Sequence, residues 1–284
     1  MSVSTNKRDR YASWSTDHMQ VRLALPGVVV VELARPPVNA MSGDLKLAML
    51  ALVERLSTEE AIRVVAFSSG IPGAFCAGSD LFELAAVHAE PGAGTERNEL
   101  EYRLWQGISG LPQVTIAAID GYALGGGLEF AVACDLRVAS REAVFSLPEI
   151  SIGGTPGIQV LARLTFLVGA GAARRLLLLG DRWSAADALT AGLVDRVADG
   201  DGAVAASLEL ASRLRDLSPT AVQFIKGALA KVVEPSQERV EAHLWAGIET
   251  VFRSPEMAEA LGHIVKTREV RHHAARDRSQ GHEN

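Results

Sequence analysis

Three consecutive glycines and two glutamates lie within one short stretch of this sequence. The glycines, 125–127, separate an apolar, strand-like run at 113–119 from a helical run at 128–134. Glu129 sits just inside the expected helix, and Glu149 follows twenty residues later. Such a glycine run turns tightly and lets a ligand approach its amides, and a helix that begins there offers unpaired N–H groups and a positive dipole end. Amide donors beside two carboxyl groups are suited to acid–base chemistry on a carbonyl compound.

A second junction of the same kind lies upstream, where Ala77-Gly78-Ser79 joins an expected strand to an expected helix. Each part alone has an ordinary explanation. A glycine run before a helix commonly serves close packing, Glu129 in a first turn would complement the helix dipole, and Pro148-Glu149 would suit a simple turn. Spacing alone therefore leaves both the catalytic and the purely structural interpretation open.

Several other kinds of site do not fit the sequence. The glycine run lacks the third glycine of a dinucleotide fingerprint, because Phe130 stands in its place. No phosphate-binding G-x-x-x-x-G-K-[ST] motif occurs, and Ser79 does not have the G-x-S-x-G context of a serine nucleophile. None of the seven histidines has the H-E-x-x-H spacing of a zinc site. We therefore expect no metal site.

The composition is that of an ordinary soluble globular protein, with 48% hydrophobic and 22% charged residues in a chain of 284. The formal net charge of −6 argues against nucleic acid and anionic membranes as partners. No run approaches the ~20 apolar residues of a membrane span, and the N-terminus lacks the apolar core of a signal peptide, so we expect a cytoplasmic location. Cys76 and Cys134 lie in apolar segments and are expected to be unpaired thiols.

Alternating strands and helices must position these residues. Val28 to Leu33 (VVVVEL) is predicted to be a buried strand, and Ser42 to cap a helix that runs through Leu56. Further strands are expected at 64–67 and 113–119, with helices at 98–109 and 128–134. Residues 88–97, rich in Gly, Pro and charge, are expected to form a loop. This order predicts an α/β core with a parallel sheet.

The chain is predicted to divide into four parts. Residues 1–18 form a loose N-terminal extension, although Tyr11 and Trp14 would allow it to be fastened to a neighbouring element. Residues 19–200 form the α/β core, residues 201–269 a helical region and residues 270–284 a charged tail. The helices expected after Gly157 span 170–179, 184–191, 203–217, 220–233, 237–252 and 256–267.

The sequence resembles the enoyl-CoA hydratase/isomerase, or crotonase, superfamily from about residue 21 to residue 268. The motifs that carry the resemblance are 35–42 (RPPVNAMS), 74–84 (AFCAGSDLFEL), 120–135, 147–157 (LPEISIGGTPG), 179–182 (LGDR) and 185–194. The resemblance implies a crotonase-like spiral of ββα units with a C-terminal helical trimerisation region, in a homotrimer or a dimer of trimers. It also implies an acyl-CoA thioester as substrate, with coenzyme A entering as part of that substrate and no separate cofactor.

The resemblance also assigns roles to single residues. In this family two backbone N–H groups form an oxyanion hole for the thioester carbonyl, and the matching residues here are Ser79 and Gly126. Family hydratases use two glutamates, which match Glu129 and Glu149, whereas many relatives with other reactions lack one of them. The pair thus favours hydration of a 2-enoyl-CoA. We assign Glu129 chiefly to activating water and Glu149 chiefly to protonating the α-carbon.

Further residues are expected to contact the substrate or its CoA part because of the motifs in which they stand: Ala77, Gly78, Asp80, Leu81, Gly125, Pro148, Gly157 and Lys266. Lys266 matches the basic end of the family's last helix, which approaches the CoA phosphates; a solvated basic tail is the alternative. Trp245, Phe252 and Leu261 would form either an apolar face toward a neighbouring subunit or an ordinary core.

One segment departs from the family pattern. After Pro156-Gly157, most family hydratases continue with a glycine-rich segment, but this chain has Ile158-Gln159-Val160-Leu161. Bulkier side chains there would reshape the acyl pocket or shift Glu149, and the variable residues 85–97 do not identify an acyl group. Other functions stay open: a Δ3,Δ2-enoyl-CoA isomerase that shuttles a proton on one glutamate, another crotonase-type acyl-CoA reaction, or a catalytically quiet acyl-CoA-binding protein.

Overall fold

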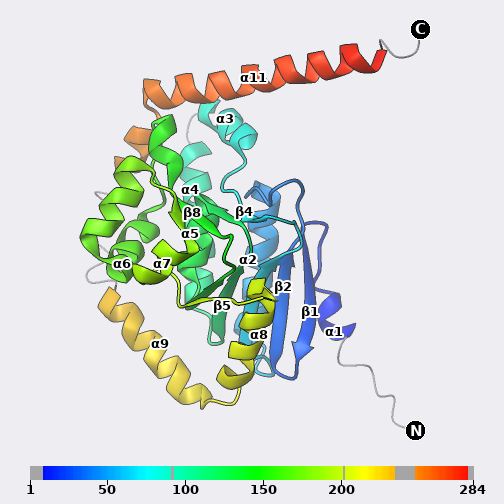
Figure 1. The fold of residues 1–284 in the computed structure, drawn as a ribbon, viewed down its shortest axis with the longest axis vertical. Coiled ribbons are helices and arrows are strands. Elements are labelled where there is room, and N and C mark those ends of the chain that lie inside the picture. Colours follow the sequence, from blue (N-terminus) through cyan, green and yellow to red (C-terminus); the bar gives the residue numbers. More distant parts are fainter. Residues whose placement is uncertain (1–8, 91–92, 201, 234–246, 281–284) are drawn as a thin grey trace.

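A computed structural model describes residues 9–90, 93–200, 202–233 and 247–280 (Figure 1). A sheet lies at the centre, helices cover it, and the long C-terminal helix α11 (Pro255–Gln280) runs along one end of the molecule. The α/β class predicted from the sequence is confirmed. None of the helices in the described ranges is long and apolar enough to cross a bilayer.

The main sheet has six strands in the order β1-β2-β3-β5-β7-β10. Strands β2, β3, β5, β7 and β10 run parallel, and β1 joins the edge antiparallel to β2. The central strands are rich in β-branched and apolar residues and are almost fully buried, as expected for parallel strands covered on both faces. The bounds are β1 (Met19–Leu25), β2 (Val28–Leu33), β3 (Val64–Ser69), β5 (Val114–Ile119), β7 (Leu136–Ala139) and β10 (Arg196–Val197).

Helices cover the two faces of this sheet separately. Val29 and Val31 of β2 belong to the larger core, which includes the buried face of α2 (Gly43–Ser57), whereas Val28 points to the other face. That second face is covered by α8 (Gly202–Leu214), which packs on β3, β5 and β7 and lies across the sheet in Figure 1. The sheet's core therefore includes a helix beyond residue 200, where we expected the helical region to begin.

A smaller sheet carries the loops that the sequence analysis singled out. Its order is β4-β6-β8-β9, from β4 (Ala74–Cys76), β6 (Tyr122–Leu124), β8 (Val144–Ser146) and β9 (Trp183–Ser184). Strands β4, β6 and β8 are parallel, so their carboxyl ends meet at one edge. The residues that follow these ends contain Ala77-Gly78-Ser79, the glycine run 125–127 and Pro148-Glu149.

The N-terminal extension is fastened to the core from residue 9 onward. Tyr11, in α1 (Asp9–Ala12), is 4% exposed and belongs to the main core, and Trp14 packs edge-on against its ring. The expectation of a loose segment is therefore wrong for residues 9–18, because two aromatic side chains bury apolar area there. Residues 1–8 lie outside the described ranges.

The expectation of a loop at residues 88–97 is also wrong. Helix α3 (Leu81–Ala89) continues into this stretch, and α4 (Ala93–Ser109) begins well before the predicted start at residue 98. Tertiary packing supports the added turn, since Gly94 lies against the ring of Phe252 and an Arg97–Glu101 ion pair spans one turn of the helix. As a result, Arg97 is a helical residue that faces other elements of the fold.

The remaining helices follow the prediction in part. Helix α6 (Ile158–Leu179) begins earlier than expected and is kinked at Gly169, and α7 (Ala185–Thr190) begins with a capping box on Ser184. Helix α9 (Pro219–Val233) starts at a proline, as predicted. Helix α11 extends through Gln280, so most of the charged tail expected from residue 270 is helical. Cys76 and Cys134 are buried free thiols, as predicted.

Candidate active site

The loops after β4 and β6 touch each other through their glycines. Gly78 has a φ of +95°, and a β-carbon there would lie 2.9 Å from the carbonyl oxygen of Leu124. Only glycine combines this backbone conformation with this close approach. A β-carbon on Gly126 would lie 3.7 Å from the backbone nitrogen of Ser79. The two predicted oxyanion donors, Ser79 and Gly126, are therefore close neighbours.

The backbone around Ser79 is held from several sides. Met41 donates its N–H to the carbonyl of Gly78 (2.8 Å), and its own carbonyl accepts from Asp80 (3.4 Å). The Asp80 carboxylate caps α3 and also accepts a hydrogen bond from Arg35 at 2.8 Å. In the described part of the chain, the N–H of Ser79 has no backbone acceptor. This leaves it free to meet negative charge on a ligand.

Gly126 offers its N–H for a different reason. It is the first residue of α5 (Gly126–Ala133), a short helix that is buried along its whole length. The first N–H groups of a helix have no partner within the helix. In the described ranges, the Gly126 N–H has no backbone acceptor elsewhere either. Together with the positive end of the helix dipole, it is suited to stabilising an oxyanion.

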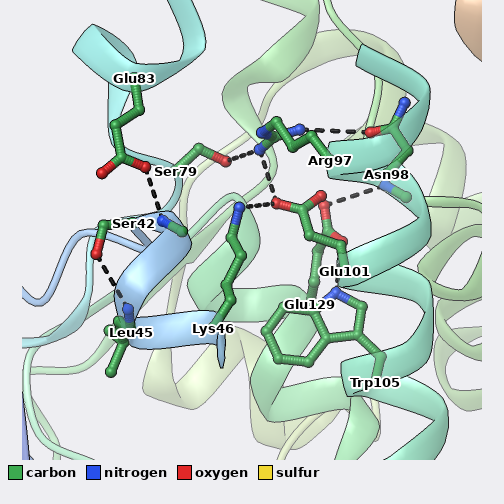
Figure 2. A network of polar contacts seen from close by, with 12 residues as sticks. Ser42, Leu45, Lys46, Ser79, Glu83, Arg97, Asn98, Glu101, Trp105 and Glu129 are labelled. Atoms are coloured by element: carbon green, nitrogen blue, oxygen red, sulfur yellow. Dashed lines mark hydrogen bonds and ion pairs between the residues drawn. The ribbon is translucent and has the colours of Figure 1, made fainter. Parts of the chain in front are cut away.

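Glu129 lies in the first turn of α5 and is 6% exposed. Its Oε1 accepts the N–H of Gly157 at 3.1 Å, and its Oε2 accepts the indole N–H of Trp105 at 3.2 Å. Figure 2 shows the Glu129 carboxyl beside the Trp105 ring. Both oxygens are therefore fixed in direction by donors that favour the ionised form.

Glu149 is held differently. It lies in the 3₁₀ helix η1 (Pro148–Ile152), and its Oε1 would be 2.7 Å from a β-carbon on Gly125, whose φ is +50°. The Glu149 Oε2 is buried and has no hydrogen-bond partner among the described residues. An unpartnered buried carboxyl oxygen favours the protonated form.

The surroundings of the two glutamates raise the pKa of both carboxyls. Burial, and then the negative charge of Glu101, raise the pKa of Glu129 to about 7. Burial, and then the negative charge of Glu129, raise the pKa of Glu149 to about 8. Both carboxyls are therefore protonated more readily than an exposed glutamate, and the two donors on Glu129 make Glu149 the better site for a shared proton. An ionised base beside a protonated acid is the arrangement expected for the roles that we assigned.

A buried ionic cluster adjoins these carboxyls and was missed by the sequence analysis. Lys46 of α2 and Arg97 of α4 both contact Oε1 of Glu101, at 2.6 and 2.7 Å, and Arg97 also donates to the Ser79 hydroxyl at 2.7 Å (Figure 2). Although burial opposes it, Arg97 and Lys46 hold the pKa of the Glu101 carboxyl below its usual value. The only local signal was the i,i+4 spacing of Arg97 and Glu101, and that was obscured because the region was expected to be a loop.

Arg97, Glu101 and the two predicted catalytic glutamates face one pocket. Its polar lining contains Ser79, Arg97, Asn98, Glu101, Glu129 and Glu149. Its apolar lining contains Leu84, Ile152, Ile248, Val251, Phe252 and Met257. The structure therefore brings together an oxyanion donor, both predicted catalytic glutamates and an apolar wall.

The other predicted contact residues differ in their distance from this pocket. Gly157 lines the pocket, Asp80 caps α3 beside it, and Ala77 is tied to Val38 through its N–H (3.0 Å). Leu81 and Pro148 are exposed at the starts of α3 and η1.

Lys266 lies apart from the pocket. It is exposed on α11, in a separate hollow that it shares with Ser151 and His263. The structure does not bring Lys266 to the carboxyls.

Two further expectations are decided by packing. Phe252 and Leu261 are buried with Leu84 and Met257 in a small cluster within this chain, as in an ordinary core. Trp245 lies outside the described residues. Of the segment with the atypical sequence, Ile158 and Gln159 begin α6 and line a neighbouring hollow next to α4.

Comparison with known proteins decides the family. The family model described as enoyl-CoA hydratase/isomerase matches residues 25–269. The chain belongs to the enoyl-CoA hydratase/isomerase family. Its crotonase fold and its resemblance to this superfamily are thereby confirmed, and it is an enzyme of the crotonase family with acyl-CoA hydratase/isomerase relatives.

Individual members of the family cover most of the chain. A probable enoyl-CoA hydratase 2, mitochondrial, of Arabidopsis thaliana is 34% identical over 78% of this chain and 71% of its own length. The 2,3-dehydroadipyl-CoA hydratase of Escherichia coli is 36% identical over 73% of this chain and 80% of its own. The crystal structure of an enoyl-CoA hydratase from Mycobacterium avium subsp. paratuberculosis superposes with a TM-score of 0.77 at 26% identity, over 87% of this chain and 99% of that chain.

Proposed function

We propose that this protein is an enoyl-CoA hydratase, which adds water across the double bond of a 2-enoyl-CoA thioester. The observation that supports it is the unequal pair of glutamates in one pocket. Glu129 is fixed by two donors, whereas Glu149 keeps a buried, unpartnered oxygen. Hydration needs a base that activates water for attack on the β-carbon and an acid that protonates the neighbouring α-carbon. Membership of a family that includes proteins named as enoyl-CoA hydratases also supports a hydratase function.

The reaction can be written with its atoms balanced. Glu129 accepts a proton from water as the water oxygen bonds to the β-carbon of the substrate. The π electrons of the double bond move toward the thioester, whose oxygen gains negative charge and is stabilised by the N–H groups of Ser79 and Gly126. Glu149 then gives its proton to the α-carbon, and the pair returns to one shared proton by transfer from Glu129 to Glu149.

The oxyanion donors supply a large share of the rate. Removing one such donor typically costs about 3–4 kcal/mol of activation free energy. Both donors here are backbone groups, so their positions are set by Gly78, by the Met41 contacts and by the start of α5. We expect the chemistry to need no metal or redox cofactor, because each step moves only a proton or an electron pair between the substrate and named groups.

A spectrophotometric assay tests the proposal. The absorbance of a short 2-enoyl-CoA at its conjugated thioester band should fall when the protein is added, and the product should carry oxygen from labelled water. Glu129→Gln keeps the size of the side chain and removes the base, so turnover should be lost. Conversion of a 3-enoyl-CoA to its 2-isomer without incorporation of labelled oxygen would favour an isomerase. CoA-ester binding without any turnover would favour a binding protein.

We also propose that the protein forms trimers, alone or paired. Helices α6 and α9 pack together and leave large apolar side chains in solvent, including Leu179 (69% exposed) and Phe224 (76% exposed). Exposed apolar patches of this kind mark interfaces. Light scattering on the purified protein should give three or six times the mass of the chain. A Leu179→Glu, Phe224→Glu double variant should lower the mass toward that of a monomer, and an unchanged mass would place the interface elsewhere.

A further inference from the structure

Arg97 stands in the pocket with the two catalytic glutamates, although the proton transfers of hydration do not use a guanidinium. Its side chain is 16% exposed, and its Nη2 contacts the Ser79 hydroxyl and Glu101 at 2.7 Å each. Figure 2 shows it lying between Ser79 and the Glu101 carboxyl. Taking a cation out of water is costly unless a partner compensates it. Its position therefore calls for an explanation.

Glu101 alone does not balance Arg97, because Lys46 already shares the same oxygen. Lys46 is almost fully buried, and its Nζ lies 2.6 Å from Glu101 Oε1. Two cations on one carboxylate leave these three groups with one net positive charge, before the negative charge of Glu129 in the same pocket is counted. Lys46 is not among the residues that line the pocket, whereas Arg97 is. Of the two cations, Arg97 is therefore the one that faces the pocket.

Arg97 also has donors to spare. A guanidinium carries five N–H groups. In the described part of the chain, it donates to Ser79, to Glu101 and, at a long 3.4 Å, to Asn98. Nη2 uses its N–H groups on Ser79 and Glu101, so the Nε–H and one N–H of Nη1 stay available, each for a single hydrogen bond to a ligand carboxylate.

Part of the pocket wall is apolar, formed by Leu84, Ile152, Val251, Phe252 and Met257. A plain alkyl chain would contact this wall well, but it would also displace water from Arg97 without accepting a hydrogen bond from it. A chain that ends in a carboxylate would satisfy both the wall and the cation.

We infer that the site accepts 2-enoyl-CoA esters whose acyl chain bears a distal carboxylate, and that Arg97 is the residue that selects them. The inference rests on the proposed hydratase function, because it names the acyl group on which that reaction acts. The competing role for Arg97 is to offset the charge of the Glu129–Glu149 pair, which would help every substrate equally.

Matched pairs of substrates test this selectivity. The six-carbon 2-enoyl-CoA with a terminal carboxylate is compared with 2-hexenoyl-CoA, and the five-carbon pair is treated in the same way. We expect the wild-type protein to have the higher kcat/KM with the carboxylated ester of at least one pair. Arg97→Gln should lower the ratio of the two kcat/KM values roughly 10- to 100-fold, as for loss of a charge-assisted hydrogen bond in a pocket. Arg97→Lys should retain part of the preference.

Arg103→Gln is the matched control, since Arg103 is an exposed arginine on the same helix; its ratio should equal that of the wild type. A wild-type preference for the uncharged esters would overturn the inference. So would an Arg97→Gln variant in which both kcat/KM values fall by the same factor, because that result assigns Arg97 to the catalytic pair.

A binding experiment separates this inference from the proposed reaction. Calorimetry compares wild-type affinity for the saturated six-carbon CoA ester with a terminal carboxylate and for hexanoyl-CoA, and needs no turnover. Tighter binding of the carboxylated ester, reduced roughly tenfold or more by Arg97→Gln, would uphold the inference even if no ester were hydrated. Equal affinities in the wild-type protein would overturn it even if hydration were observed.

Discussion

Trp105→Phe tests whether the indole N–H sets the ionisation of the catalytic base. The substitution removes the donor that lies 3.2 Å from Glu129 Oε2 and keeps an aromatic ring in place. That ring stacks on Phe130 with centroids 5.7 Å apart, so most of the buried packing should survive. The main change is therefore the loss of one hydrogen bond to a buried carboxylate.

The size and sign of the effect follow from this bond. A hydrogen bond to a charged group contributes about 1.5–3 kcal/mol, and one pKa unit corresponds to about 1.4 kcal/mol. The bond favours the ionised form, so its loss should raise the pKa of Glu129, already about 7, by roughly one to two units. At pH 7 the ionised fraction of the base would fall from about one half, and kcat/KM should fall about 5- to 50-fold.

The assay is kcat/KM for a short 2-enoyl-CoA across the pH range in which both proteins stay folded. The acidic limb of the profile should move to higher pH in Trp105→Phe, and activity should recover in part above that limb. Trp14→Phe is the control, because Trp14 lies at the N-terminal side of the core against Tyr11; its profile should match the wild type. A uniform loss at every pH, with the limb unmoved, would refute this role for Trp105.

Three further results are expected. Glu129→Gln should raise the melting temperature at pH 8–9 more than at pH 5. Above pH 4.5 the unfolded chain loses the Glu129 proton while the folded protein keeps it, because the pKa of Glu129 in the folded protein is raised to about 7. The free energy of unfolding of the wild type therefore falls by roughly 3 kcal/mol as the pH rises from 4.5 to about 7. Equal melting-temperature gains at both pH values would contradict this. Gly125→Ala should lower kcat at least tenfold, because its methyl group would lie 2.7 Å from Glu149 Oε1 at a positive φ; kinetics equal to the wild type would show that Glu149 can move without cost. Prolonged treatment with EDTA should leave the hydration rate unchanged, and a loss that Mg²⁺ or Zn²⁺ restores would show that a metal takes part.

Much of the catalytic centre could be predicted from the sequence because it depends on local backbone features. Ser79 and Gly126 stand in the turns that follow short strands, where a glycine and a helix start expose amide groups. Because these strands are parallel, their carboxyl ends meet at one edge of the sheet, and the loops that follow them lie together there. The two glutamates are fixed by the same elements, so their meeting in one pocket could be expected from the motifs.

The ionic cluster could not be predicted in the same way, because it depends on contacts between distant elements. Lys46 and Glu101 are 55 positions apart in the sequence, and they meet only because α2 packs on α4. Arg97 was expected in a loop on the basis of nearby Gly and Pro residues, and its helix is stabilised by contacts with residues near the C-terminus, such as Phe252. Local propensity is overridden there by tertiary packing.

The pocket is lined by two sets of residues that come from different parts of the sequence. The amides and carboxyls come from the segments that follow short strands and from a buried helix, while most of the apolar wall comes from α3 and from residues 248–257, with Ile152 of η1 added. A substitution in the wall can therefore change which acyl chain fits without displacing a catalytic group. Selection for a new substrate can act on one set while the other stays fixed, so the same reaction can be directed to different acyl groups largely through changes in peripheral helices.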